Sequence, residues 1–314
     1  MRPCMHIMGA LLLMAHPAEA DKLRLVGCLP HYRVDALETS GAIFLDDLLY
    51  FAVIPGPRGT LDMSNVRAAH LKKLDHIRRK HKVKIHLAIG SWGRGKHFPE
   101  TAASAQNREN FAQALLGYCV KHHFSGVDLD WEFPANPQEE RNFVLLIRDT
   151  ARILHAKGLS ISVSVNPRRL PLPEAIPHLD RLYLMSYDHD GRHSTLAQAR
   201  TDLQLALKAG IAPQKLYLGV PFYGRKINNR AQASTYAEIL NRHRPSPETN
   251  EAGGYFFNGP RLLHSKASLA QERGLSGISI WEIGQDTAGN ASLLRKLWDW
   301  TQSTGNQTRD RTKP

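Results

Sequence analysis

Residues 124–134 have the sequence Phe-Ser-Gly-Val-Asp-Leu-Asp-Trp-Glu-Phe-Pro. In an extended strand, successive side chains point to opposite faces. The acidic residues Asp128, Asp130 and Glu132 therefore share one face of the predicted strand. The other face carries the apolar residues Val127, Leu129 and Trp131. This alternation excludes a solvated edge strand, and it predicts that the three carboxyl groups point into an interior while the apolar face packs against helices.

This stretch belongs to a series of eight short apolar runs, most of them separated by segments with helical periodicity, as at 107–121 and 139–156. The predicted strands are 23–29, 48–54, 83–89, 126–132, 159–165, 181–187, 215–220 and 277–282. Eight such units predict an α/β fold, the closed (β/α)8 TIM barrel. A doubly wound open sheet is the alternative. It is disfavoured because no glycine-rich phosphate-binding turn follows the first run.

The chain divides into a leader, one domain and a tail. Residues 1–20 combine a basic start, a short apolar run and the ending Ala18-Glu19-Ala20, which is typical of a cleavable signal peptide. The prediction is a secreted or periplasmic protein with a single barrel domain over 21–302 and a polar tail over 303–314. Residues 224–275, between the seventh and eighth runs, are long enough for a small insertion. No run is long enough to span a bilayer.

Composition narrows the class of protein further. The chain has 314 residues, of which 42% are hydrophobic and 22% charged, with a net charge of +12. These values are ordinary for a globular protein, and the charge favours anionic surroundings such as cell walls. No nucleic-acid-binding motif accompanies the basic residues. Of the three cysteines, Cys28 and Cys119 lie outside the leader; two buried thiols are favoured over a disulfide bridge.

The three carboxyl groups predict acid–base chemistry. Carboxylates that share a site of low dielectric cannot all ionise, so at least one pKa rises. A carboxylic acid that stays protonated near neutral pH is a general acid, and barrel enzymes place such groups at the C-terminal ends of their strands, where Glu132 lies. A Mg²⁺ or Ca²⁺ site is the alternative, but no nearby Asp or His completes a ligand set. We therefore expect no metal and no cofactor.

The spacing of residues 125–132 resembles the D-x-x-D-x-D-x-E motif of glycoside hydrolase family 18, the chitinases and their relatives. Four further segments on their expected strands resemble other motifs of that family: Ala88-Ile89-Gly90-Ser91-Trp92, Met185-Ser186-Tyr187-Asp188, Val220-Pro221-Phe222-Tyr223-Gly224-Arg225 and Ile280-Trp281-Glu282. Five motifs in the family's order, spread over most of the predicted domain, make the resemblance specific.

The resemblance implies a retaining mechanism without an enzymic nucleophile, whereas most glycosidases use two carboxylates. Glu132 is expected to protonate the glycosidic oxygen, and the 2-acetamido oxygen of the substrate is expected to attack the anomeric carbon. Asp130 orients the acetamido N–H, and Asp128 shares a proton with Asp130. Tyr187 donates its hydroxyl to the acetamido carbonyl. The bond cleaved is the β-1,4 bond after an N-acetylglucosamine in chitin or chito-oligosaccharides.

The resemblance also implies a set of substrate-binding residues. Trp281 is expected to form the floor under the sugar, because an aromatic face suits the apolar face of a pyranose. The other expected binding residues are Trp92, Tyr32, Asp188, Tyr223, Arg225 and Met185.

Two positions depart from the family pattern. Ser125 stands where the first motif Asp is usual, at the start of the strand, and a structural effect is expected there. Ala88 stands where a serine usually contacts the second Asp. Loss of that hydrogen bond predicts a weaker hold on Asp128, by about 1 kcal/mol, and it leaves the resting position of Asp130 open.

Other functions are compatible with the same motifs. The same chemistry could act on peptidoglycan or on the N-glycan core, and the positive charge supports an anionic cell wall. A non-catalytic chitin-binding lectin on the same barrel is a further alternative, since fold alone does not prove activity. Such relatives typically lose the motif glutamate, and Glu132 is present. The expected partner is an N-acetylglucosamine-containing saccharide, bound by a monomer; no nucleic acid is expected.

Overall fold

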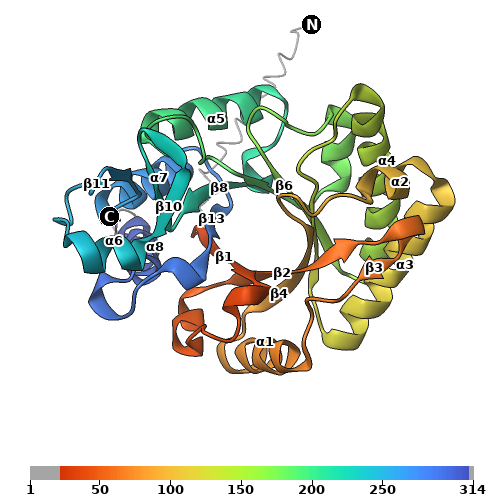
Figure 1. Cartoon of the computed structure of the whole chain (residues 1–314), viewed down its shortest axis with the longest axis horizontal. Coiled ribbons are helices and arrows are strands. Elements are labelled where there is room, and N and C mark those ends of the chain that lie inside the picture. Colours follow the sequence, from red (N-terminus) through yellow and green to blue (C-terminus); the bar gives the residue numbers. More distant parts are fainter. Residues whose placement is uncertain (1–21, 311–314) are drawn as a thin grey trace, which may run out of the picture.

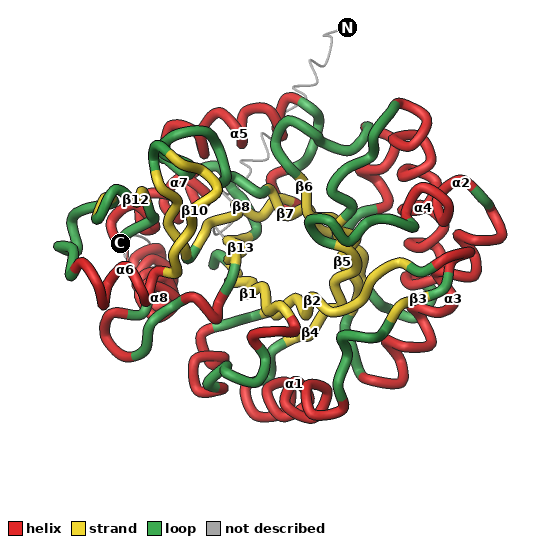
Figure 2. Tube along the Cα trace, viewed as in Figure 1, coloured by secondary structure: helices red, strands yellow, loops and turns green. Residues whose placement is uncertain are grey.

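The computed structural model describes residues 22–310, so the predicted leader 1–20 lies outside the described residues. Eight parallel strands close into a ring in the order β1-β13-β8-β7-β6-β5-β4-β2, and β2 pairs with β1. Figure 2 shows this ring at the centre of the molecule, with helices outside it. The strands are β1 (Arg24–Pro30), β2 (Asp47–Pro55), β4 (Lys84–Gly90), β5 (Gly126–Asp130), β6 (Ser160–Val165), β7 (Arg181–Leu184), β8 (Leu216–Pro221) and β13 (Gly277–Trp281). The predicted (β/α)8 barrel is confirmed.

The helices surround the ring and cover the outer faces of its strands (Figure 1). They are α1 (Ala68–His81), α2 (Phe98–Ala103), α3 (Ala105–His122), α4 (Pro137–His155), α5 (Leu196–Lys208), α7 (Pro260–Glu272) and α8 (Leu293–Asp310). Helix α8 therefore takes in residues 303–310 of the predicted tail. None of the helices within the described residues is long and apolar enough to cross a membrane.

Helix α4 illustrates how local sequence sets these elements. Asn136 precedes the helix, and its side chain accepts a hydrogen bond from the backbone N–H of Glu139 at 3.0 Å. Pro137 occupies the first turn, where its missing N–H costs nothing. Farther along the helix, one face of apolar residues, including Phe143, packs against the barrel.

The predicted insertion between the seventh and eighth barrel strands is present as a small antiparallel sheet of order β10-β9-β12-β11 together with one helix. Its elements are β9 (Tyr223–Lys226), β10 (Asn229–Thr235), α6 (Tyr236–His243), β11 (Glu251–Ala252) and β12 (Tyr255–Phe256). Another short strand, β3 (Leu61–Asp62), pairs antiparallel with β2.

The structure corrects the ends of two predicted strands. Strand β5 ends at Asp130 and not at residue 132, and β7 ends at Leu184 and not at residue 187. Glu132 and Tyr187 thus lie in the loops beyond the strands, at the C-terminal end of the barrel. The two cysteines Cys28 and Cys119 are buried and unpaired, in agreement with two buried thiols.

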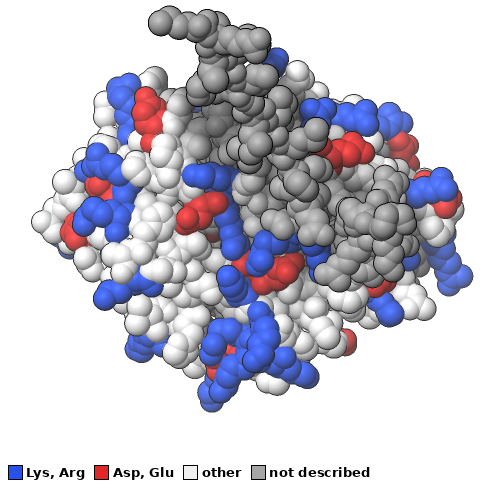
Figure 3. Space-filling model, turned by 180° about the vertical axis from the view of Figure 1, so that it is seen from behind, with Lys and Arg blue, Asp and Glu red and all other residues white. Residues whose placement is uncertain are grey.

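On the face in Figure 3, Lys and Arg lie in several separate groups, and Asp and Glu lie beside some of them. The opposite end of the barrel from the loops of Glu132 and Tyr187 has a buried charged cluster. Asp47 is fully buried, and its carboxylate accepts a hydrogen bond from Arg24 Nη2 at 2.6 Å. The same carboxylate lies 2.9 Å from His86 Nε2 and 3.0 Å from Arg181 Nη1. Burial alone raises the pKa of Asp47, but the His86 hydrogen bond and the two arginine charges outweigh it and hold the pKa well below its usual range.

We expect Asp47→Asn to lower the free energy of unfolding at pH 7 by about 3 kcal/mol, because it leaves the largely buried Arg181 and the partly exposed Arg24 without their counter-charge. The carboxyl pKa is lower in the folded state, so its stabilisation is present above the unfolded value of about 4 and is lost as the pH falls below it. Urea unfolding at pH 7 and pH 3 measures both effects. Asp299→Asn is the control, since the exposed pair of Asp299 with Arg295 is 3.9 Å long and such pairs contribute about 0–1 kcal/mol. An equal effect of the two substitutions would contradict the prediction.

Candidate active site

The row of carboxyl groups lies where the alternation predicts. Asp128 is fully buried and Asp130 is 2% exposed inside the barrel, whereas Glu132, in the loop after β5, is partly exposed. On the outer face of the same segment, Trp131 stacks on Phe98 of α2 with ring centroids 5.3 Å apart. The outer face therefore anchors the segment against helices, while the inner face presents its acids to the open end of the barrel.

Burial raises the pKa values of all three acids above their usual values. Burial raises the pKa of Asp128 to about 6. Burial and the charges of Glu132 and Asp128 raise the pKa of Asp130 well above its usual value. Burial and the charge of Asp188 raise the pKa of Glu132 to about 7. Glu132, with a pKa of about 7, retains its proton near neutral pH and is suited to general acid catalysis.

Asp128 is held by hydroxyl groups that the sequence analysis did not single out. Ser162 Oγ donates to Asp128 Oδ1 at 2.7 Å, and Ser164 Oγ donates to Asp128 Oδ2 at 2.9 Å. Both hydroxyls come from β6, so Asp128 has two donors although Ala88 offers none from β4; the expected cost of the missing β4 hydroxyl stays a prediction. The alternating serines of residues 160–165 are the signal that could have identified them.

Tyr187 lies in the loop after β7, next to β8. A Cβ atom on Gly219 of β8 would lie 3.0 Å from Tyr187 Cε1, so the glycine leaves room for this ring. The Tyr187 ring meets Tyr223 edge-on, with centroids 6.4 Å apart. Burial, together with nearby acidic groups, raises the pKa of the Tyr187 hydroxyl well above its usual value, so the group is a hydrogen-bond donor at any working pH.

Asp188 links this loop to the small antiparallel sheet. It accepts hydrogen bonds from Tyr223 Oη at 2.6 Å and from Arg225 Nη2 at 2.8 Å, and Arg225 Nε is a further donor. His193 Nδ1 lies 3.6 Å away. Burial alone raises the pKa of Asp188, but these donors hold it well below the usual range. Asp188 is thus a fixed negative charge beside the carboxyl row. Tyr223 is only 6% exposed, so its visible role is to hold Asp188.

Trp281 ends β13, which lies across the ring from β5: β8, β7 and β6 separate the two strands on one side, and β1, β2 and β4 on the other. Its half-buried ring meets Phe51 edge-on at 5.1 Å. The next residue, Glu282, is buried and accepts a hydrogen bond from Arg33 Nε at 3.0 Å. This pair ties the loop after β13 to the loop after β1, and the sequence analysis missed Arg33.

Two of the predicted aromatic binding residues are unusually exposed. The side chain of Trp92 is 76% exposed and that of Tyr32 is 61% exposed. Trp92 meets Phe133 edge-on with centroids 6.5 Å apart, which places it next to the loop of Glu132. Met185 is partly buried at the start of the loop after β7. Exposed aromatic faces at the open end of the barrel can stack on sugar rings.

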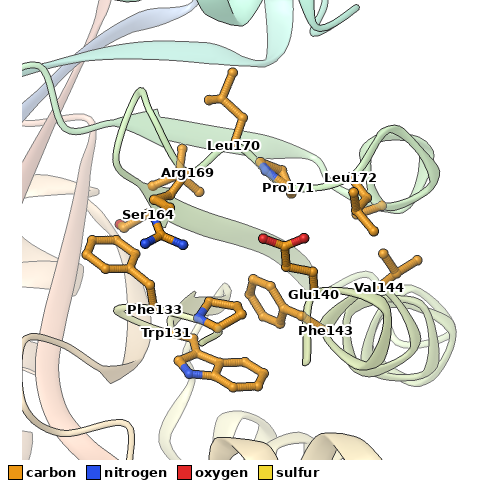
Figure 4. A pocket seen from close by; sticks show the side chains of 13 residues that line it. Trp131, Phe133, Glu140, Phe143, Val144, Ser164, Arg169, Leu170, Pro171 and Leu172 are labelled. Atoms are coloured by element: carbon orange, nitrogen blue, oxygen red, sulfur yellow. The ribbon is translucent and has the colours of Figure 1, made fainter. Parts of the chain in front are cut away.

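A small cavity lies between the loop after β5, which carries Glu132, and helix α4 (Figure 4). Its volume is about 30 Å³, and its lining includes Trp131, Phe133, Ser164 and Arg169. That volume admits water but no sugar ring. Among the described residues, no group of three or more His, Cys, Asp or Glu side chains is arranged to hold a metal ion.

Comparison with known proteins places this site in a family context. Residues 37–286 match the model of the glycosyl hydrolases family 18. Chitinase 1 of Aphanocladium album is 27% identical over 270 residues, covering 68% of this chain and 64% of that protein. Probable chitinase 2 of Drosophila melanogaster is 29% identical over 292 residues, covering 71% of this chain and 60% of that protein. The match thus spans less than two thirds of the length of either relative.

Solved structures share the fold. A GH18 chitinase, ChiB, from the chitin utilization locus of Flavobacterium johnsoniae superposes with a TM-score of 0.80 at 22% identity, covering 90% of this chain and 95% of the other. A chitinase from Bacteroides thetaiotaomicron superposes with a TM-score of 0.78 at 20% identity, covering 90% and 97%.

Proposed function

The chain belongs to the glycosyl hydrolases family 18, and from this premise we propose that it hydrolyses the β-1,4 bond after an N-acetylglucosamine in chitin or chito-oligosaccharides. The observation that supports the proposal most strongly is the row of three interior carboxyl groups, with Glu132 at its open end and a pKa of about 7. Glu132 protonates the leaving glycosidic oxygen in this proposal, as a general acid.

The nucleophile is the acetamido oxygen of the substrate, and the product retains the anomeric configuration. Asp130 accepts the acetamido N–H and stabilises the cyclic oxazolinium ion. Tyr187 donates its hydroxyl to the acetamido carbonyl. Support for these roles comes from position: Asp130 lies on the same face as Glu132, and the Tyr187 hydroxyl has a pKa far too high to ionise.

Binding of the sugar is assigned to the aromatic and polar residues around the row. Trp281 forms the floor under the reacting sugar, and Trp92 and Tyr32 stack on sugars to either side. Asp188 and Arg225 bond to hydroxyl or acetamido groups, with Tyr223 holding Asp188 and Met185 lining the site. The exposure of Trp92 and Tyr32 supports stacking, because a plain core role would leave them buried.

We further propose export from the cytoplasm, on the basis of residues 1–20. One observation favours a different polymer: the net charge of +12 suits an anionic cell wall, so the same chemistry on peptidoglycan is the second candidate. A product profile on chitohexaose beside purified peptidoglycan decides between them. Release of dye from chitin-azure separates an enzyme from a lectin; no release and no oligomer products would overturn the proposed activity.

The dependence of kcat/KM on pH is expected to be bell-shaped and narrow. Activity falls above about pH 7 because Glu132 loses the proton it must donate. It falls below about pH 6 because Asp128 becomes protonated and the row loses the negative charge that stabilises the oxazolinium ion. Initial rates on a chito-oligosaccharide between pH 4 and pH 9 measure the profile. A flat profile over this range would contradict the coupled-carboxyl account.

A further inference from the structure

The two strands beside β5 contribute very different residues at the level of Asp128. The register pairs Ala88 of β4 with Asp128, and Asp128 with Ser162 of β6. Residues paired in register on adjacent strands point to the same face. Ala88 belongs to the buried apolar cluster inside the barrel. Asp128 thus has a methyl group on one side and a hydroxyl on the other.

Both carboxylate oxygens of Asp128 receive a hydroxyl from β6, at 2.7 Å from Ser162 and at 2.9 Å from Ser164. Ser162 Oγ also lies 3.2 Å from the backbone oxygen of Val127. By contrast, Asp130 Oδ1 is buried without a hydrogen-bond partner among the described residues. Hydrogen bonds from hydroxyls favour the ionised carboxylate. The arrangement therefore separates the charges: the negative charge stays on Asp128 and the proton on Asp130.

We propose that Ser162 and Ser164 are positioning residues of the reaction, which fix Asp128 from β6 as the charged partner of Asp130 at neutral pH. The inference rests on the proposed function of the carboxyl row. It assigns to two serines of β6 the task that a hydroxyl on β4 would otherwise perform.

Within residues 22–310, no cationic group shifts the pKa of Asp128. The titratable groups whose charges interact with that of Asp128 are Cys28 of β1 and Tyr183 of β7, two strands that do not pair with β5, and Asp130 of its own strand. Burial raises the pKa values of Cys28, Tyr183 and Asp130, and none of these side chains is positively charged in either protonation state, so none of them favours the ionised form of Asp128. The hydroxyls of β6 are the groups that lower the pKa of Asp128 against its burial.

The test is the double variant Ser162→Ala/Ser164→Ala. We expect kcat on chitohexaose to fall on the order of tenfold for each hydroxyl lost, with KM nearly unchanged. The acidic limb of the pH profile should move up by about one pH unit, because an Asp128 without donors is protonated more easily. A profile that superimposes on that of the wild type overturns the proposal.

A rescue variant separates positioning from general packing. Ala88→Ser, added to the double variant, places a hydroxyl on the other side of Asp128, at the neighbouring-strand spacing of about 4.8 Å. It should restore the acidic limb and most of kcat. If kcat stays low and the limb stays displaced, the serines serve packing alone and the proposal fails. Ser164→Ala alone, at the rim of the barrel, gives the same test should the double variant not fold.

A measurement without substrate distinguishes this inference from the proposed function. The difference in melting temperature between the wild type and the double variant should increase as the pH rises from 5 to 8. The reason is that Asp128 of the wild type carries the charge that the hydroxyls stabilise only at the upper end of this range. A constant difference refutes the role of the serines. An inactive wild type with an increasing difference refutes the proposed activity alone.

Discussion

Replacing Glu132 by glutamine is expected to lower kcat on chito-oligosaccharides by roughly 10²–10⁴-fold, the range typical for loss of a general acid. Glutamine keeps the size and shape of the side chain, but its amide N–H is far too weak an acid to protonate the leaving oxygen. The fold should not change, because Glu132 lies in a loop beyond β5 and its burial is incomplete. Removal of a carboxyl that is costly to ionise can even raise the melting temperature.

Rates on chitohexaose, with binding measured separately by calorimetry, test this prediction. Glu272→Gln at the exposed end of α7 makes the same chemical change far from the carboxyl row and serves as the control. A Glu132→Gln protein that retains more than about a tenth of wild-type activity would show that another group is the acid.

Removal of the acetyl group from the substrate is expected to abolish cleavage almost completely. In the proposed mechanism the nucleophile belongs to the sugar, so a glycan with a free amine at the reacting position has no oxygen to attack the anomeric carbon. A thiazoline analogue of the oxazolinium ion should inhibit, because it has the shape of the intermediate. Equal rates on fully deacetylated chitosan and on chitin oligomers of equal length would contradict the mechanism. So would a trapped glycosyl adduct on an Asp or Glu, seen by mass spectrometry.

The same proposed mechanism predicts that loss of the Asp130 carboxylate harms the reaction more than loss of the Asp128 carboxylate. Asp130→Asn should weaken both turnover and thiazoline inhibition, and it should do so more than Asp128→Asn. The reason is that Asp130 contacts the acetamido group directly in this proposal, whereas Asp128 acts through Asp130. Comparable losses in the two variants would contradict this ranking, and a larger loss in Asp128→Asn would reverse it.

Much of the fold is predictable because the informative signals are local. Side-chain alternation has a period of two residues, so the stretch around Asp128 and Asp130 predicts an inner acidic face and an outer apolar face, and both are observed. The ends of β5 and β7 are wrong in the prediction because a strand ends where its partner stops pairing, and this depends on other parts of the chain.

The parts of the candidate site that escaped prediction are contacts between distant segments. Arg33 and Glu282 are 249 positions apart in the chain, yet they form a hydrogen bond of 3.0 Å. The hydroxyls of Ser162 and Ser164 reach Asp128 only because β5 and β6 pair in one particular register. A motif comparison confined to one strand finds Ala88 in place of a serine and cannot detect that another strand supplies the hydroxyl.

The small antiparallel sheet has a practical consequence for protein engineering. Strand β9 opens the insertion, yet its residues Tyr223 and Arg225 bind Asp188 beside the carboxyl row. A chimera in which the whole segment after β8 comes from another barrel protein would lose the small sheet and, with it, the hydrogen bonds from Tyr223 and Arg225 to Asp188. The segment that can be exchanged therefore begins after Lys226, and chimeras joined there should keep the contacts of Asp188 beside the carboxyl row.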